Sequence, residues 1–561
     1  MNNNYSLSTA SRTSRLEQLS EEKLDILVIG GGITGAGISL DAAARGLKTG
    51  LIEMQDFAAG TSSRSTKLVH GGLRYLKQLE VKLVAEVGKE RAVVYENAPH
   101  VTEPQWMLLP IIKKGTFGRT ATSFGLRIYD ALAKVKKEEQ RFMLTKGKTL
   151  EKEPLLRTED LIGSGVYVEY RTDDARLTLE AIKKGAELGA NPVNYTRAES
   201  FIYVGSRIKG VQVKDLLNGR TYSIYAENIV NAAGPWVDNL RDKDGSKTGK
   251  HLHLTKGTHL VFDRHRFPLR QATYFDAPDG RMLFAIPRDK KTYVGTTDTT
   301  YDAEIASPRM TIEDRDYILK MVNNMFPSLK LSTEDVESSW AGLRPLIYEE
   351  GKSASEISRK DEVFVSDSGL ISIAGGKLTG YRKMADKIVN LIVKQMNLHA
   401  PCPTAEVPLS GGNVGGSSGF ETFVKKEAFK GVEAGLAKEE AEFLLRFYGS
   451  NALKIFELLE ENIKKAKDSG LPLKLAAQLI YALEYEMSAT PLDFFNRRTG
   501  KLYFAIEDVG KWQDGVTAFM KAELGWTEEE TNQHKTELQT EVNYAKLPVE
   551  EVDNDFSRIG I

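Results

Sequence analysis

The sequence is poor in the features that cross-link a chain or anchor it in a membrane. Cys402 is the only cysteine among 561 residues, which excludes an internal disulfide or a site of several thiolates and is typical of a reducing compartment. No run of about 18 consecutive apolar residues occurs, so no membrane-spanning helix is expected. The 76 Lys and Arg nearly balance the 77 Asp and Glu, which argues against nucleic acid as a partner. These absences predict a cytoplasmic protein.

The chain divides into parts that differ in composition. Residues 1–22 lack the apolar segment of a secretory signal and are expected to form a mobile leader. Residues 23–400 mix short β-branched runs with amphipathic stretches, which predicts an α/β arrangement. The stretch 401–420, rich in Gly and Ser towards its end, indicates a linker. Apolar residues three and four apart over 421–561 predict a C-terminal all-α domain.

A glycine motif near the start of the chain indicates a dinucleotide site. The apolar strand Asp25–Ile29 runs into the sequence GGGITG, and an Ala-rich helix pattern follows. In this setting Gly30 permits a tight turn, Gly32 lets backbone N–H groups approach a pyrophosphate, and Gly35 lets the helix pack on the strand. Glu53 ends the next predicted strand and is placed to accept the hydroxyls of an adenosine ribose. A glycine-rich structural turn is the alternative.

Two further strands end in small residues and favour FAD over NAD. The run 229–231 is followed by Ala-Ala-Gly, and the run 371–374 is followed by Gly-Gly-Lys. Small residues at a strand end let backbone pass close to a ligand, and three such ends suit a long buried cofactor better than a nicotinamide in an open crevice. The hydroxyl-rich segment 61–67 could add donors, although such a cluster alone is typical of a solvated turn.

These motifs resemble one family, the FAD-dependent (aerobic-type) glycerol-3-phosphate dehydrogenases, within the wider group of flavoproteins similar to D-amino-acid oxidase. The resemblance runs from Asp25 to about Asn397, and the helical tail is also of the kind that this family carries. It rests on the motifs GGGITGAGISLDAAARGL, TSSRSTKLVHGGLRYL, YRTDDARL, NAAGPW, TKGTHLV, GTTD, GLRPL and GGKLTGYRKMA. HGGLRYL followed by GGKLTGYRK is the most specific combination.

The resemblance implies a mixed α/β fold with a Rossmann-type FAD-binding domain, an inserted β-rich substrate domain and the C-terminal helical domain. The FAD-binding domain is expected over about 23–100, 160–250 and 350–400, and the substrate domain over about 101–159 and 251–349. The implied reaction is oxidation of sn-glycerol 3-phosphate to dihydroxyacetone phosphate, by hydride transfer from C2 to flavin N5. A membrane quinone is the usual onward acceptor in this family.

The implied cofactor-binding residues lie at or just beyond the predicted strand ends. They are Gly30, Gly32, Gly35, Glu53, Thr61, Ser62, Ser63, Lys67, Leu68, His70, Gly71, Gly72, Ala233, Gly234, Gly376, Lys377, Leu378 and Thr379. His70 is expected to orient backbone near the flavin ring. Lys377 is expected beside the flavin, where a cation stabilises the anionic N1/C2=O side of the reduced ring. A salt-bridged structural lysine is the alternative for Lys377.

A substrate with a dianionic phosphate needs paired cations, and arginine binds phosphate bidentately. The resemblance places Arg74 and Arg344 at the substrate, and Arg359 is a third candidate, although each alone is typical of a surface or structural arginine. The apolar setting of Trp340–Leu346 predicts that the Arg344 guanidinium is buried and needs an anion. Arg281 is a further candidate that could instead brace a turn.

Oxidation of an alcohol also requires a base for the hydroxyl proton. His259 opens an apolar strand and is the base that the resemblance favours, with a core histidine or arginine-assisted proton removal as alternatives. Arg344 and Lys377 complete the expected catalytic set. The remaining substrate residues are expected to be Tyr75, Thr296 and Asp298. No metal is expected, because none of these residues has metal-ligand spacing.

Residues 111–148 contain ten Lys or Arg against three acidic residues, interleaved with aromatic and aliphatic side chains. Such a stretch could lie on an anionic bilayer, at the inner face of the cell membrane, and bring reduced flavin to a quinone. It could equally be a solvated helical face that covers the substrate domain. The expected partners are the phosphate substrate, a membrane quinone, an anionic membrane surface and a second copy of the chain in a homodimer.

Three functions stay open from the sequence. The leading one is a dehydrogenase that passes electrons to quinone. The second is an oxidase that makes hydrogen peroxide, although the insertion that longer family oxidases carry before the C-terminal domain is not evident. The third is a non-catalytic flavin-binding or membrane-docking protein, against which the presence of Arg74, Arg344 and Lys377 argues.

Overall fold

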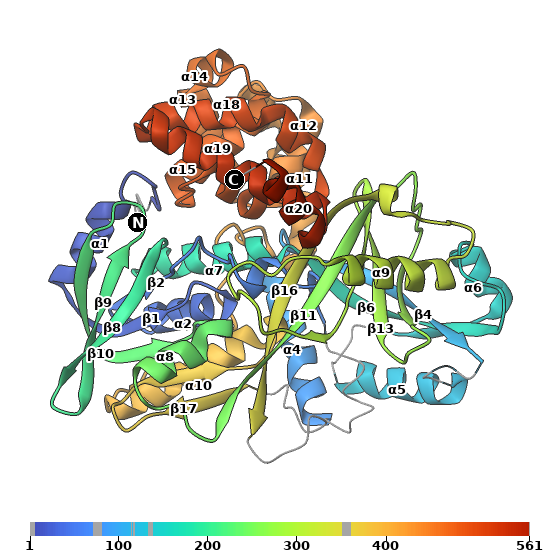
Figure 1. Cartoon of the computed structure of the whole chain (residues 1–561), viewed down its shortest axis with the longest axis horizontal. Helices are drawn as coiled ribbons and strands as arrows, with labels where there is room; N and C mark the ends of the chain where they lie inside the picture. The colour runs from blue at the N-terminus through green and yellow to red at the C-terminus, as the bar shows by residue number, and fades with distance from the viewer. Residues whose placement is uncertain are drawn as a thin grey trace.

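The computed structural model describes residues 6–70, 81–113, 115, 118–132, 139–349 and 361–559. These residues form two sheets, one of eight strands and one of ten, with a helical domain above them in the view of Figure 1. We call the eight-stranded sheet the first sheet and the ten-stranded sheet the second sheet. The mixed α/β fold with a C-terminal helical domain confirms the predicted fold class.

The first sheet is built around a parallel core. Its central strand β1 (Lys23–Ile29) is apolar and buried from Ile26 onward, as expected of a strand covered on both faces. The order across the parallel core is β18 (Ile371–Ala374), β10 (Thr221–Asn231), β1, β2 (Thr49–Ile52) and β7 (Asn191–Val193). The antiparallel additions are β17 (Glu362–Val365) at one edge, and β8 (Thr196–Val204) with β9 (Arg207–Asp215) beside β10.

Three helices pack side by side next to the first sheet. They are α10 (Tyr381–Gln395), α2 (Ile33–Ala44) and α7 (Asp174–Glu187), with α2 in contact with both others. A Cβ added at Gly35 of α2 would lie 1.9 Å from the carbonyl oxygen of Gly30, so glycine is needed where the helix crosses the strand end. The N-terminus of α2 therefore stands directly beyond β1.

The second sheet lies next to the first and consists mainly of antiparallel strands. Its order is β15 (Thr299–Thr300), β11 (Lys250–Asp263), β14 (Lys291–Gly295), β13 (Met282–Arg288), β12 (Ala272–Asp276), β4 (Thr102–Ile112), β6 (Leu161–Thr172) and β3 (Leu68–Val69). The long strand β16 (Val336–Glu349) pairs with β11, and β5 (Phe142–Thr145) pairs with β6. The helices beside these two sheets are α1 (Arg12–Glu21), α4 (Val81–Asn97), α5 (Arg119–Leu132), α6 (Lys146–Lys152), α8 (Val237–Lys243) and α9 (Ile312–Met325).

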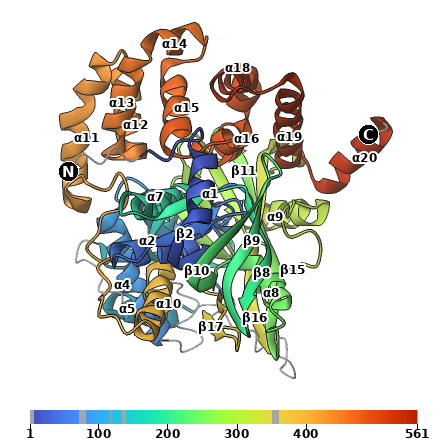
Figure 2. The ribbon, with the colours of Figure 1, turned by 90° about the vertical axis from the view of Figure 1, so that its left-hand side faces the viewer.

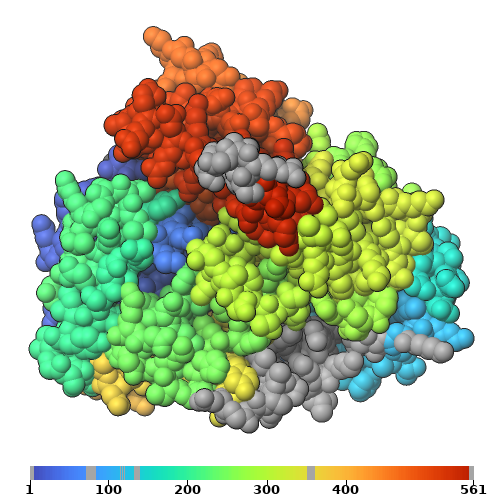
Figure 3. Space-filling model, in the orientation of Figure 1, coloured from blue at the N-terminus to red at the C-terminus, as the bar shows by residue number. Residues whose placement is uncertain are grey.

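The helical domain lies across the top of the α/β body in Figure 2. Its helices are α11 (Gly416–Glu433), α12 (Lys438–Tyr448), α13 (Asn451–Glu461), α14 (Ile463–Asp468), α15 (Leu473–Tyr485), α16 (Pro491–Asp493), α17 (Lys501–Phe504), α18 (Ile506–Leu524), α19 (Glu528–Lys546) and α20 (Val549–Ile559), with a π-helical turn at Phe494–Arg498. Figure 3 shows the surface hollowed beneath this domain, where N-terminal residues, in blue, form the floor.

Two expectations about the connecting segments differ from the structure. Residues 12–21 of the predicted mobile leader form α1, because Leu16 and Leu19 are buried in the core of the first sheet and Arg12 pairs with buried Asp215. The predicted linker 401–420 is docked rather than free. Its Leu409 and Val414 side chains are buried, and α11 begins inside it.

The predicted domain boundaries also need one correction. Strand β6 was expected in the FAD-binding domain, but it pairs with β4 throughout its length and so belongs to the second sheet, as does β3. Within the segment 111–148, the Ile111, Leu126 and Tyr129 side chains lie in the core and are not available to a membrane. Among the described residues, no helix combines the length and apolar composition needed to cross a bilayer.

Candidate active site

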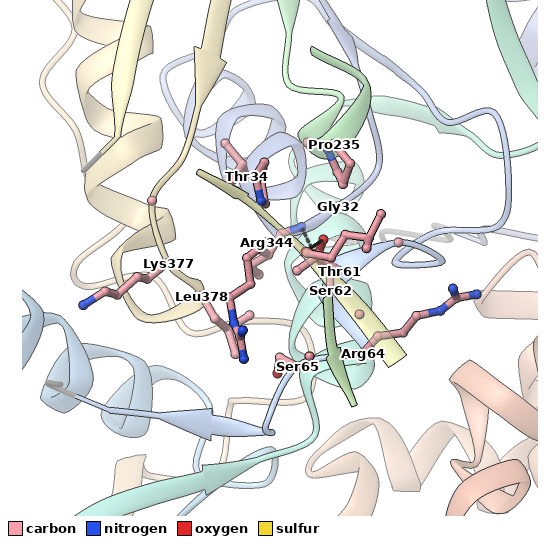
Figure 4. Close-up of a pocket in the computed structure, with 18 of the residues that line it drawn as sticks. Gly32, Thr34, Thr61, Ser62, Arg64, Ser65, Pro235, Arg344, Lys377 and Leu378 are labelled. Carbon is pink, nitrogen blue, oxygen red and sulfur yellow. Dashed lines mark hydrogen bonds between the residues drawn. The ribbon is translucent and has the colours of Figure 1, made fainter. Parts of the chain in front are cut away.

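A cavity of about 920 Å³ lies between the two sheets (Figure 4). The first sheet contributes the residues that follow the carboxyl ends of β1, β10 and β18, and these three strands are parallel neighbours. The second sheet contributes residues of β11, β13 and β16. The three glycine-closed strand ends therefore converge on one site, as their sequences predicted.

The glycine motif forms a close-fitting cradle at the end of β1. Gly30 has a φ of 116°, and a Cβ added there would lie 2.5 Å from the Ala232 carbonyl oxygen. The Ile33 N–H, at the start of α2, donates to Ser62 Oγ over 2.9 Å (Figure 4). Backbone N–H groups at a helix N-terminus favour anionic phosphate. The cradle thus fits the pyrophosphate of a dinucleotide, with Ser62 beside it.

Glu53 stands at the end of β2, where the ribose of a dinucleotide is expected. Its Oε2 accepts a hydrogen bond of 2.7 Å from the Gly31 N–H, and its Oε1 accepts one of 2.8 Å from the Gln55 N–H. Burial raises the pKa of the Glu53 carboxyl, and these two backbone donors act in the opposite direction. The carboxylate is therefore fixed in place beside the glycine cradle.

Several predicted cofactor-binding residues form hydrogen bonds with other protein groups. Lys67 and Ser63 do not line the cavity: the Lys67 ammonium donates to Asp174 Oδ1 over 2.6 Å and to the Ser63 carbonyl over 2.9 Å. The Thr61 hydroxyl lines the cavity but donates to the Leu343 carbonyl of β16 over 2.7 Å. The Lys67 ammonium is thus bound by Asp174 and the Ser63 carbonyl within the protein.

Thr379 holds His70, the residue directly after β3. Thr379 Oγ1 accepts from the His70 N–H over 3.0 Å and donates to the His70 carbonyl over 3.2 Å. Burial, together with the charges of Lys377 and Arg91, lowers the pKa of His70 to about 3, so this imidazole is neutral. Lys377, Leu378, Ala233, Gly234, Gly376 and Leu68 also line the cavity. Gly71 and Gly72 lie outside the described residues.

His259 lines the cavity from β11 and is almost fully buried. It is 1% exposed, and its ring is stacked 4.7 Å from the Trp340 ring. Its Nε2 lies 3.0 Å from the hydroxyl of Thr66, a residue that also lines the cavity. Burial, and then the positive charges of Arg344 and Lys67, lower the pKa of His259 well below its usual value. The imidazole is therefore neutral at neutral pH.

Arg344 reaches the cavity from β16, among the residues drawn in Figure 4. Its Nη1 donates to Asp298 Oδ1 over 3.0 Å, and its Nη2 donates to Thr296 Oγ1 over 3.1 Å. The prediction that Arg344 is buried is wrong: its side chain is 33% exposed, because the buried stretch of β16 ends at Leu343. The guanidinium is thus held by Asp298 and Thr296 with part of its surface open.

The remaining predicted substrate residues divide into two groups. Arg281 lines the cavity, pairs with Asp279 over 3.3 Å and lies 4.7 Å above the Tyr317 ring, so it also braces the turn between β12 and β13. Arg74, Tyr75 and Arg359 lie outside the described residues.

The charge of the cavity lining favours anions. Six Lys or Arg and four Asp or Glu belong to the described lining. Two residues that sequence reasoning missed are Arg64 and Thr66. Both lie in the hydroxyl-rich segment 61–67, which was the available signal. Arg64 is 9% exposed and points away from Arg344 in Figure 4.

One cluster of potential metal ligands is already paired with an arginine. Ligand atoms of Asp41, Asp386 and Cys402 lie within 4.8 Å of one another. The Arg45 guanidinium pairs with Asp41 over 2.6 Å and with Asp386 over 3.1 Å. Its positive charge occupies the place where a cation would be attracted.

Similarity to known proteins covers nearly the whole chain. The profile of the FAD dependent oxidoreductase family matches residues 25–382, and that of the C-terminal domain of alpha-glycerophosphate oxidase matches residues 402–531. The aerobic glycerol-3-phosphate dehydrogenase of Bacillus subtilis is 55% identical, over 98% of this chain and 100% of that protein. This chain belongs to the FAD-dependent glycerol-3-phosphate dehydrogenase family. The relative from Staphylococcus haemolyticus is 53% identical, over 96% of this chain and 98% of that protein.

Solved structures of this family and of related flavoproteins agree with the fold. The glycerol-3-phosphate dehydrogenase from Bacillus halodurans, complexed with FAD, matches with a TM-score of 0.86 at 53% identity, over 97% of this chain and 99% of that one. L-alpha-glycerophosphate oxidase from Mycoplasma pneumoniae has a TM-score of 0.55 at 17% identity, over 68% of this chain and 96% of that one, which concerns the fold alone. Membership of the glycerol-3-phosphate dehydrogenase family confirms the prediction of FAD as cofactor.

Proposed function

We propose that this chain oxidises sn-glycerol 3-phosphate at C2 to dihydroxyacetone phosphate. The observation that carries the proposal is the junction of the two sheets: the cradle of the first sheet fits FAD, and Arg344 of the second sheet reaches the same cavity. Relatives with 55% and 53% identity are aerobic glycerol-3-phosphate dehydrogenases. Bound FAD supplies the two-electron acceptor for such an oxidation.

Arg344 is the residue we assign to the substrate phosphate. Its guanidinium is oriented by Asp298 and Thr296 while a third of its side-chain surface stays open. A phosphate dianion is bound best by such a fixed planar fork. Arg74 and Arg359 remain its predicted partners, and Lys377 and Arg281 add positive charge to the same lining.

His259 is the base we assign to the hydroxyl proton. His259 and Thr66 both line the cavity, and His259 Nε2 lies 3.0 Å from the Thr66 hydroxyl. In this assignment the substrate proton passes to Thr66 Oγ1 as Thr66 gives its own proton to His259 Nε2. Burial, and then the charge of Arg344, lowers the pKa of His259. A bound phosphate dianion offsets that charge, so substrate binding raises the proton affinity of His259.

Anaerobic titration of the purified FAD-loaded protein tests the substrate. We expect sn-glycerol 3-phosphate to bleach the flavin absorption at about 450 nm. Glycerol, which lacks the phosphate, should leave the spectrum unchanged at the same concentration. The proposal fails if sn-glycerol 3-phosphate causes no bleaching while an amino acid such as glycine does.

For the onward acceptor we propose a quinone rather than oxygen. The support is the dehydrogenase identity of the full-length relatives. After anaerobic reduction, a soluble quinone analogue should restore the yellow colour quickly and air slowly. Fast recolouring by air with formation of hydrogen peroxide would favour the oxidase instead.

Peripheral membrane attachment and a homodimer stay predictions. Among the described residues of 111–148, Phe124 on α5 is 66% exposed, and Arg127 one turn further along is also exposed. An aromatic side chain next to a cation suits an anionic bilayer surface. Sedimentation with anionic vesicles, compared between the wild type and Phe124→Ser, checks this contact.

A further inference from the structure

A buried carboxylate connects the helical domain to the loop that frames the cofactor cradle. Asp56 is 1% exposed and lies in the loop between Glu53 and Ser62. Its Oδ1 accepts from Arg498 Nη2 over 2.8 Å and from Asn194 Nδ2 over 3.0 Å. Its Oδ2 accepts from Arg498 Nη1 over 2.6 Å and from Arg497 Nε over 2.5 Å. Three of these four bonds come from the helical domain.

The two arginines are themselves fixed. Both lie in the π-helical turn Phe494–Arg498 and are buried. Arg497 Nη2 donates to Asp493 Oδ1 over 2.6 Å, and Arg498 Nη2 donates to the Glu486 carbonyl over 2.7 Å. A guanidinium with bonds in two directions has little freedom to follow Asp56 if the domain shifts. The position of Asp56 is therefore set by the helical domain.

The loop around Asp56 contacts the glycine cradle directly. The Ala58 N–H donates to the Gly31 carbonyl over 3.0 Å, and a Cβ added at Gly31 would lie 2.9 Å from Phe57 Cδ1. On the other side of Asp56, the Tyr195 N–H donates to the Gln55 carbonyl over 2.8 Å. Residues on both sides of Asp56 are thus tied to the backbone of the glycine motif or to the turn after β7. A displacement of Asp56 moves the Gly31 N–H that orients Glu53.

We propose that the helical domain is a determinant of FAD affinity, acting through Arg497 and Arg498 on Asp56, which is a positioning residue for the cradle. The effect does not depend on which substrate is oxidised. It predicts that loosening this one junction weakens FAD binding beyond what a general loss of stability would cause.

The chain contains a matched control for this effect. Glu486 of the helical domain is also fully buried, and its carboxylate is held by Arg176 and Lys183 of α7. The substitutions Asp56→Asn and Glu486→Gln each remove one buried charge from the same domain junction, with little change in shape. Only Asp56 lies in the loop that frames the cradle.

The experiment measures two quantities for each variant: the melting temperature of the apoprotein, and the FAD dissociation constant from fluorescence titration. We expect both variants to lower the melting temperature. Asp56→Asn should raise the FAD dissociation constant by about tenfold or more, and Glu486→Gln by about twofold or less.

Two results would overturn the proposal: equal loss of FAD affinity in both variants, or unchanged affinity in Asp56→Asn. If Asp56→Asn does not fold, Arg497→Lys takes its place. This variant keeps the charge but loses the planar fork that binds Asp56 and Asp493 together, and it faces the same comparison with Glu486→Gln.

Discussion

The side chains that face the cavity owe their properties to residues behind them. Neutral His259 lines the cavity, is stacked on Trp340 and contacts the Thr66 hydroxyl. Arg344 is aimed by Asp298 and Thr296. The reactive surface is therefore an outer layer of hydroxyls and cations that a buried layer orients.

Thr66 gives the first prediction at this scale. Thr66→Val removes the hydroxyl while preserving the shape, and we expect the rate constant of flavin reduction to fall by about 10²–10⁴, the range typical of general base catalysis. Thr66→Ser, which keeps the hydroxyl, should retain most of the rate. Anaerobic rapid mixing measures both, and equal rates for Thr66→Val and the wild type would show that no proton passes through Thr66.

Site residues with local requirements could be predicted, and those with distant partners could not. The need for Gly30 and for Glu53 follows from the strand and turn beside them, and the structure has both at the cavity. Nothing near Lys67 in sequence reveals that Asp174, 107 residues later, holds its ammonium. For the same reason Thr66 was overlooked, because its partner His259 is 193 residues away.

At the scale of elements, the crossing of α2 over the end of β1 decides whether the cradle forms. We expect Gly35→Ala to lower both the FAD affinity and the melting temperature, because the added Cβ meets the backbone of Gly30 at 1.9 Å. Gly125→Ala is the matched helical control. No atom lies within 4 Å of a Cβ at Gly125, so this change should leave FAD binding intact and raise stability by about 1 kcal/mol through helix propensity.

Thermal unfolding and FAD titration of these two variants check this expectation. Retention of full FAD affinity in Gly35→Ala would contradict the assigned role of the strand–helix crossing.

Element types were predictable more reliably than their partners. The apolar runs at β1, β10 and β18 indicated buried strands, and the structure pairs them in parallel. Strand β6 reads equally well as part of either sheet, and only its pairing with β4 assigns it to the second. Helix α1 has few apolar residues, so its periodicity was too weak to distinguish it from a leader.

At the scale of the whole molecule, buried ion pairs join the helical domain to the first sheet. Arginine partners lower the pKa of Asp56 to about 2, and Arg176 with Lys183 lowers the pKa of Glu486 to about 2. In the unfolded chain these carboxyls titrate near pH 4. The stability that they contribute is therefore complete above about pH 4–5 and is lost as the pH falls towards 2.

We thus expect the melting temperature to fall steeply below about pH 4. The double variant Asp56→Asn, Glu486→Gln should be less stable at pH 7 and should show a shallower decrease in acid. Calorimetry from pH 7 to pH 3 checks both. An identical slope in the wild type and the double variant would contradict a role of these pairs in acid sensitivity.

The arrangement of the domains was beyond sequence reasoning. The sequence predicted a helical tail, but Asp56 and Arg497 are 441 residues apart, and neither carries a local pattern that indicates the other. The meeting of the two sheets at one cavity could not be predicted for the same reason. It depends on contacts between residues far apart in sequence, such as the hydrogen bond from Thr61 to Leu343.

The central claim is that the first sheet holds FAD while the second sheet recognises the substrate phosphate. The most direct test is anaerobic titration of Arg344→Ala with sn-glycerol 3-phosphate, compared with the wild type. We predict an unchanged flavin spectrum and FAD content, with the substrate concentration for half bleaching raised by about 10–100-fold, since a hydrogen bond to a charged group contributes about 1.5–3 kcal/mol. An unchanged titration, or loss of FAD from the variant, would contradict this division between the sheets.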